Sequence, residues 1–187
     1  ELLEMKDKFG DERLTKIAPA EGEFEEEDLI KEEQTVIALT HFGYIKRMPV
    51  DTYKSQRRGG KGITGIATRE DDFVKEIFTA STHDTILFFS NKGKMYRLRG
   101  FEIPEAGRTA KGTAIVNLLN LEAGEKISAI IPIQNFADGK YILMATKNGL
   151  IKKTSLKEYD SARRTGLLGI TLKEGDSLID VRLTDGE

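Results

Sequence analysis

Seven residues at positions 56–62, QRRGGKG, have the composition of a phosphate-binding loop. Three cations stand among three glycines, so the backbone can approach a phosphodiester chain closely. Amide groups and cationic side chains are then both available to the phosphate oxygens. The related segments at 107–112 (GRTAKG) and 161–166 (SARRTG) keep cations but lose the paired glycines. The pattern favours a repeated anion contact, and a flexible glycine-rich surface turn is the alternative.

The residues give little support for a nucleotide-binding, metal-binding or catalytic site. Residues 107–113, GRTAKGT, carry Lys-Gly-Thr where a nucleotide-binding loop needs Gly-Lys-Thr. The chain has no cysteine and two histidines, which argues against disulfides, thiolate chemistry and a histidine-rich metal site. His83 precedes Asp84, but no serine has the context of a nucleophile, so we expect a turn with a hydrogen-bonded histidine. We therefore expect no catalytic residue, metal or cofactor in this chain.

Charge is distributed unevenly along the 187 residues. Residues 1–33 contain 5 Lys/Arg and 13 Asp/Glu, a net charge of -8, whereas residues 34–187 contain 24 and 18, a net charge of +6. Three windows, 43–62, 90–111 and 147–164, hold six Lys/Arg each. Many charged residues usually mean a solvated surface of mixed charge. One cluster of cations in each repeat instead indicates a basic binding face.

A repeat becomes visible when three glycines, Gly43, Gly93 and Gly149, are aligned. Around them the chain reads TVIALTHFGYIKRMPV, TILFFSNKGKMYRLRG and YILMATKNGLIKKTSL, the pattern of a hairpin followed by a basic exit. The entering strands are almost continuously apolar, which is typical of strands covered on both faces. We expect these strands at 36–39, 86–89 and 142–145.

The second halves of the repeats also align. They read KGITGIA, KGTAIVNLL and TGLLGITL, followed by strands expected at 75–81, 126–133 and 177–183. Four strands every 50 to 56 residues predict an all-β array of propeller-like blades, of which three form a partial ring. A β-sandwich is the alternative. Five phenylalanines are expected in the core rather than in base stacking: Phe78, Phe88, Phe89, Phe101 and Phe136.

The N-terminal region has a different character. Residues 1–17 predict the end of a helix that begins upstream, and residues 18–33 an acidic linker. We expect a hydrophilic spacer there, the alternative being a segment that folds back on the basic face. No apolar run is long enough to cross a membrane, so a cytoplasmic protein is expected.

The segment QRRGGKG resembles the gyrase-A box, the signature of the C-terminal domain of the DNA gyrase A subunit. Residues 8–17 (KFGDERLTKI) are similar to the end of that protein's breakage-reunion domain, and the acidic linker resembles its interdomain linker. The stretches IVNLL and MATKNGLIKKT look like later blades of the family. The resemblance implies a β-pinwheel, a propeller variant with strands exchanged between blades, here 34–84, 85–140 and 141–187.

The resemblance implies a module that wraps duplex DNA around a basic rim, so that ATP-dependent strand passage introduces negative supercoils. The assembled enzyme also contains the gyrase B subunit together with a second A subunit, and it uses ATP and Mg²⁺. None of the five tyrosines follows an arginine, as the family's catalytic tyrosine does, so the nucleophile is expected outside this chain. The A subunit of topoisomerase IV, whose C-terminal domain is similar, and a propeller-type protein-interaction scaffold are the alternatives.

The predicted DNA contacts fall into two groups. The box contributes Gln56, Arg57, Arg58, Gly59, Gly60, Lys61 and Gly62. The remaining rim contributes Lys46, Arg47, Lys94, Arg97, Arg108, Lys111, Lys152, Lys153, Arg163 and Arg164.

Overall fold

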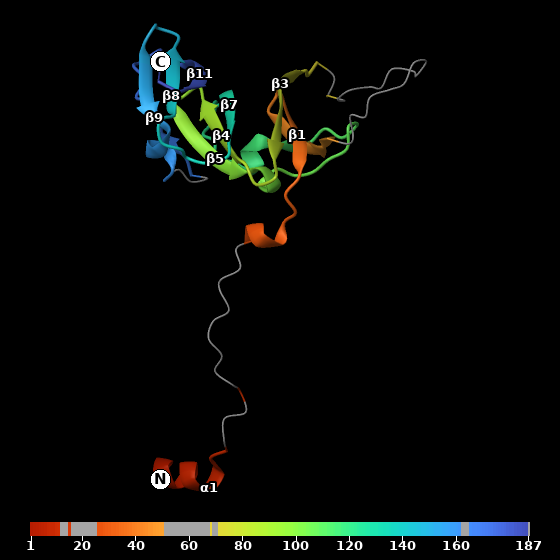
Figure 1. Cartoon of the computed structure of the whole chain (residues 1–187), viewed down its shortest axis with the longest axis vertical. Coiled ribbons are helices and arrows are strands. Elements are labelled where there is room, and N and C mark those ends of the chain that lie inside the picture. Colours follow the sequence, from red (N-terminus) through yellow and green to blue (C-terminus); the bar gives the residue numbers. More distant parts are fainter. Residues whose placement is uncertain (12–14, 16–25, 51–67, 69–70, 162–164, 187) are drawn as a thin grey trace.

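The computed structural model is almost entirely β and describes residues 1–11, 15, 26–50, 68, 71–161 and 165–186 (Figure 1). The strands, in chain order, are β1 Gln34–Thr40, β2 Tyr44–Pro49, β3 Val74–Ser81, β4 Thr85–Ser90, β5 Lys94–Arg99, β6 Thr113–Ala114, β7 Ile127–Ile133, β8 Tyr141–Thr146, β9 Ile151–Ser155, β10 Leu167–Leu168 and β11 Leu178–Thr184. The helices are α1 Leu2–Phe9 and the short 3₁₀ turns η1 Glu26–Leu29, η3 Gly100–Glu102, η4 Ile115–Asn117 and η5 Leu156–Tyr159.

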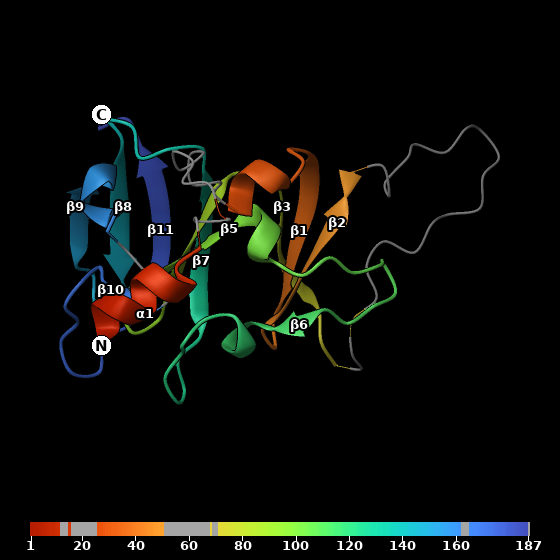
Figure 2. The same ribbon diagram turned by 90° about the horizontal axis from the view of Figure 1, so that it is seen from below.

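The described strands form three antiparallel sheets that lie side by side in a row, as Figure 2 shows. Their strand orders are β3-β1-β2-β6, β10-β5-β4-β7 and β11-β8-β9. This row confirms the blade prediction, and the sandwich alternative is wrong because the strands divide into three sheets rather than two. The expected hairpins are also confirmed, since β1–β2, β4–β5 and β8–β9 pair directly around the aligned glycines.

The hydrophobic core lies between neighbouring sheets. Along β4, Ile86 and Phe88 pack in one buried cluster with residues of the first sheet, while Leu87 and Phe89 pack in another with residues of the third. Successive side chains of a strand point to opposite faces, so a strand between two cores must be apolar at every position. All six residues of β4 are buried for this reason.

In the second and third repeats, the third segment belongs to the sheet of the preceding repeat. β6 comes from the second repeat and pairs with β2, through Tyr44↔Ala114 and Ile45↔Thr113. β10 comes from the third repeat and pairs with β5, through Leu167↔Met95. The first two sheets have the expected four strands, and the third has three strands among the described residues.

Glycine permits this exchange of strands at two aligned positions. Gly112 (φ +86°) and Gly166 (φ +87°) precede β6 and β10. A Cβ on Gly112 would lie 2.6 Å from the carbonyl oxygen of Ile45, and one on Gly166 would lie 2.6 Å from Cε1 of Tyr96. Both the left-handed backbone and the close contact with the preceding blade exclude a side chain.

The glycine at the start of β6 generates a stability prediction. Gly112→Ala combines left-handed strain with a collision against β2, whereas Gly124→Ala has positive φ (+74°) but no atom within 4 Å of the new Cβ. We expect Gly124→Ala to cost about 1 kcal/mol from strain, and Gly112→Ala to cost at least about twice that. Urea unfolding of both variants beside wild type measures the difference. Equal losses would show that the exchanged strand does not need this close approach.

Candidate nucleic-acid interface

The predicted rim cations lie largely at repeated positions of the second hairpin strand. Aligned on the turn glycines, Arg47 of β2 corresponds to Arg97 of β5 and Lys153 of β9. One position earlier, Lys46 corresponds to Tyr96 and Lys152. In β2 and β5 these positions adjoin the sheet edge along which the following repeat's chain runs, so their side chains can either face solvent or bind that chain.

Lys46 binds the segment of the following repeat, and the residue is only 2% exposed. Its Nζ donates to the carbonyl oxygens of Gly107 at 3.2 Å, Arg108 at 2.8 Å and Ala110 at 2.6 Å. Burial lowers the pKa of this lysine below its usual value. All three ammonium hydrogens have an acceptor, so this geometry does not favour the predicted direct contact between Lys46 and DNA.

Arg47 is also largely occupied within the fold, with a side chain 12% exposed. Its Nε donates to the carbonyl of Ile103 at 3.1 Å, and its guanidinium lies 3.8 Å from Glu33 and 3.5 Å from Glu105. Backbone hydrogen bonds from Arg47 N to Pro104 O and from Ala106 N to Arg47 O bind the same crossing segment. Arg47 thus fastens residues 103–106 to β2.

Two cations of β5 have partners but stay partly exposed. Arg97 Nη1 donates to the carbonyl of Asp160 at 2.8 Å, and its guanidinium lies over the ring of Phe136. Lys94 pairs with Glu122, and this hydrogen bond raises the lysine's pKa. Their side chains are 34% and 30% exposed, so both remain accessible to a phosphate.

Arg108 and Lys111 lie in the loop that precedes β6. Ala110 N donates to Gly107 O at 3.1 Å, which closes a turn with Arg108 and Thr109 at its centre. Arg108 is half-buried and Lys111 exposed, and neither side chain has a hydrogen bond or ion pair with another residue in the described part of the chain. These two cations are therefore available to an external anion.

Lys152 and Lys153 of β9 are exposed. Lys152 Nζ donates to Gly169 O at 2.7 Å, and Lys153 Nζ to Gly186 O at 3.2 Å with Tyr141 beneath it. A single carbonyl leaves hydrogens of each ammonium free for a phosphate.

Part of the predicted site lies outside the described residues. This holds for all seven residues of the box and for Arg163 and Arg164. In sequence, Arg58 and Lys61 of the box align with Arg108 and Lys111. The 107–112 loop is therefore the described counterpart of the box, and the roles of the box residues stay predictions.

The end of the acidic segment lies against the first two sheets. His83 Nε2 lies 2.8 Å from the carbonyl of Ile30, which confirms a turn with a hydrogen-bonded histidine. Thr82 Oγ1 donates to Lys31 O at 2.9 Å, and Arg99 pairs with Glu27. The end of the segment therefore contacts the β-sheets through Glu27, Ile30 and Lys31, and the linker interpretation of 18–33 stays a prediction. Sequence analysis missed Arg99 and Thr82 here because their partners lie more than 50 positions away.

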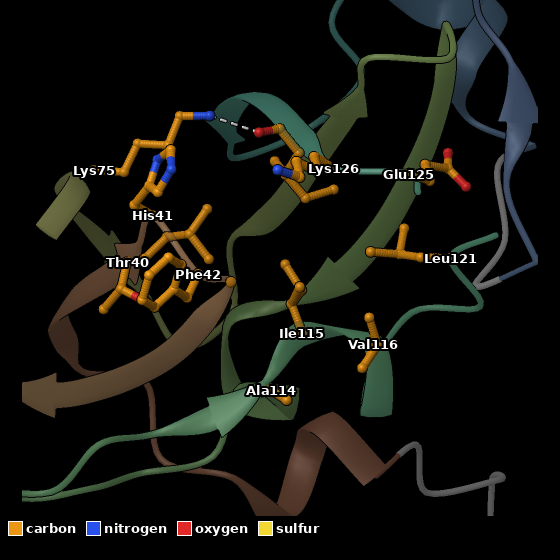
Figure 3. Close-up of a pocket in the computed structure, with 13 residues that line it drawn as sticks. Thr40, His41, Phe42, Lys75, Ala114, Ile115, Val116, Leu121, Glu125 and Lys126 are labelled. Carbon is orange, nitrogen blue, oxygen red and sulfur yellow. Dashed lines mark hydrogen bonds between the residues drawn. The ribbon is translucent and has the colours of Figure 1, made fainter. Parts of the chain in front are cut away.

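A pocket of about 240 Å³ lies beside the β1–β2 turn (Figure 3). Of its polar side chains, Lys75 donates its Nζ to Ile127 O at 2.7 Å, His41 stacks on Phe73, and Lys126 is exposed. Glu125 accepts a hydrogen bond from Tyr96 Oη at 2.9 Å. The pKa of Tyr96 is raised, mainly by burial and also by this carboxylate. Lys75 and Glu125 are thus held by partners within the fold.

The phenylalanines confirm the expected core positions in four cases. Phe88 and Phe89 are fully buried, and Phe78 and Phe136 pack against the two main clusters. Phe101 is half-buried in η3. Among the described residues no helix is long and apolar enough to span a membrane, and no three acidic or histidine side chains gather as metal ligands.

Comparisons with known proteins agree with the repeat and the fold. The DNA gyrase A subunit of Halalkalibacterium halodurans is 57% identical over all 187 residues, and that of Clostridium acetobutylicum is 54% identical. The chain spans 22% of the length of each. The crystal structure of a DNA topoisomerase IV C-terminal domain matches with a TM-score of 0.71 and 32% identity, covering 84% of this chain and 47% of that one.

A solved DNA gyrase A C-terminal domain matches in fold, with a TM-score of 0.56 and 24% identity over 80% of this chain and 64% of that one. The family described as "DNA gyrase C-terminal domain, beta-propeller" matches over residues 34–81, 84–134 and 140–185, with one match for each repeat. These three matches cover most of the chain, which therefore belongs to the DNA gyrase C-terminal domain family.

Proposed function

We propose that this chain is the part of a DNA gyrase A subunit that binds duplex DNA and wraps it around a basic rim. Family membership supports the proposal, and one structural observation carries it. The loop that corresponds to the box presents Arg108 and Lys111 without a described ion partner, at the edge where one repeat joins the next. In sequence, the corresponding segments of the other two repeats also carry cations.

The contacts would be made to the DNA backbone. Phosphates carry charge at regular spacing, so cations that recur with each blade can bind successive phosphates without reading sequence. Among the described rim cations predicted from the sequence, the best placed are Arg108, Lys111, Lys152 and Lys153, which are exposed or have no described ion partner. Binding should therefore tolerate any sequence and weaken with salt.

Wrapping needs more than attraction. Bending a site of 20–30 base pairs by 40–90° costs roughly 1–6 kcal/mol by elastic estimates, so contacts must hold both ends of the arc. We assign the closing contact to Arg57, Arg58 and Lys61 of the box. The paired glycines Gly59 and Gly60 let its backbone approach the duplex.

In the assembled enzyme, the wrap would deliver a duplex segment to the cleavage gate with a fixed crossing sign. The proposed partners are the gyrase B subunit together with a second A subunit, while ATP and Mg²⁺ act in other parts of that cytoplasmic enzyme. The catalytic tyrosine is expected outside this chain, which contributes binding and bending. Negative supercoiling then results from ATP-dependent strand passage.

Topoisomerase IV is the neighbouring alternative, since a solved C-terminal domain of that enzyme matches at 32% identity. The intact box and the higher identity to curated gyrase proteins, 57% and 54%, favour gyrase. The two enzymes differ in whether relaxed circular DNA becomes negatively supercoiled.

The rim generates a prediction about salt. We expect non-specific DNA affinity to fall with a slope of about 0.9 per neutralised phosphate on log axes, and on the order of eight contacts would cost three to five decades between 50 and 200 mM salt. Fluorescence anisotropy with duplexes of two unrelated sequences measures this slope. A slope near zero, or a strong preference for one duplex, would contradict this prediction.

The box generates a second prediction, which separates bending from binding. Replacing Arg57, Arg58, Lys61, Gly59 and Gly60 with alanine removes three of the 18 clustered cations, so DNA should still bind, with a salt slope lower by no more than about three units. The assembled enzyme should keep ATP-independent relaxation and DNA cleavage but lose negative supercoiling. Supercoiling of relaxed circular DNA, with a bending assay on this chain, measures both effects.

A matched control removes equal charge elsewhere. Replacing Lys147, Lys152 and Lys153 with alanine also removes three clustered cations but leaves the box intact. We expect this variant to lose similar affinity while it retains supercoiling. Normal supercoiling by the box variant, or its equal loss in the control, would refute the assignment of the closing contact to the box.

A further inference from the structure

The buried ammonium group of Lys46 lies within the turn that carries Arg108. The segment from the second repeat touches β2 at two places, residues 103–106 beside Arg47 and β6 beside Ile45. Between these contacts the chain leaves the sheet as the loop at 107–112. Lys46 lies at the same point of β2, and its Nζ donates to three of the loop's carbonyls.

Aligned residues show that this arrangement is a special feature of Lys46. Tyr96 takes the corresponding position in β5 and donates its hydroxyl to Glu125. Lys152 takes it in β9, where it is exposed and donates to the single carbonyl of Gly169. Among the described residues at this position, Lys46 is the one that organises a cationic loop.

We propose that Lys46 is a positioning residue for DNA binding, whose ammonium fixes the 107–110 turn so that Arg108 and Lys111 meet the DNA phosphates. The inference rests on the proposed DNA-binding function and deepens it. Lys46 itself does not touch DNA. It acts through the backbone of the loop.

The physical reason is preorganisation. Three carbonyls directed at one buried cation form charge-assisted hydrogen bonds, which are stronger than bonds between neutral groups. Without the ammonium these carbonyls must form hydrogen bonds with water, and the turn is no longer held in one conformation. Arg108 and Lys111 would keep their charges but would have to be ordered by the DNA, which weakens binding.

A double-mutant cycle tests the proposal on this chain. Lys46→Met keeps most of the apolar stem and removes the ammonium. We expect it to lower the salt slope by up to about 1.8, the value for two contacts, and the affinity at 0.1 M salt by roughly 10- to 100-fold. In the Arg108→Ala/Lys111→Ala background the same substitution should have no further effect, because the groups it positions are gone.

Lys152→Met is the matched control. This exposed lysine at the aligned position should lower the slope by about 0.9 as a direct contact, and its effect should add to that of Arg108→Ala/Lys111→Ala. Unchanged affinity in Lys46→Met would overturn the proposal. An additive loss of about 0.9 in the slope would also overturn it, because Lys46 would then be a direct contact.

Wild-type protein supplies a measurement that does not depend on the variant's folding. A limiting dose of an amine-acylating reagent, with peptide mass spectrometry, should leave Lys46 unmodified with or without DNA. Lys111 should be modified in free protein and protected by DNA. Acylation of Lys46 that DNA prevents would overturn the inference, whereas protection of Lys111 alone supports it. Absence of any DNA binding by wild type would overturn the proposed function and this inference together.

Discussion

The pairing of a short strand from one repeat with the sheet of the preceding repeat is the constraint on which the rest of the structure depends. β6 and β10 are only two residues long, yet they cover the edges of β2 and β5. An uncovered edge leaves backbone groups unpaired and invites association with other chains. The first two blades are therefore completed by their successors, and their stability is shared between neighbours rather than held within one repeat.

This exchange also decides where charge can be presented. The crossing chain must leave one sheet and join the edge of another, and at the first joint it forms the loop at 107–112. On the first joint, Arg47 fastens the incoming segment and Lys46 holds the turn, which leaves Arg108 and Lys111 without a described partner. Lysine and arginine thus serve two purposes at this joint. Some cations build the loop, and others are displayed by it.

Local sequence patterns predicted the strands and turns better than the hydrogen-bond and ion-pair partners of individual side chains. The apolar run of β4 and the turn glycine Gly93 follow from rules that act over a few residues, and both predictions are confirmed. The burial of Lys46 depends on carbonyls more than 60 positions away, which no periodicity reports. The contacts of Glu27 with Arg99 and of Ile30 with His83 were missed for the same reason. The sequence predicts the rim as a region, whereas the state of each cation depends on the tertiary fold.

Counting cations therefore overstates the number that can bind phosphate. Arg47 and Arg99 already face Glu33 and Glu27 of the acidic segment, and a phosphate could reach them only by replacing those carboxylates. Such an exchange contributes little to the binding free energy of DNA, because one anion replaces another and the displaced carboxylate must be solvated again. Exposed cations lose only water and counterions when they meet DNA, so the salt dependence of binding should reflect these residues. Paired cations still shape the long-range field, in which the net charge of +6 beyond residue 33 attracts the duplex before any contact forms.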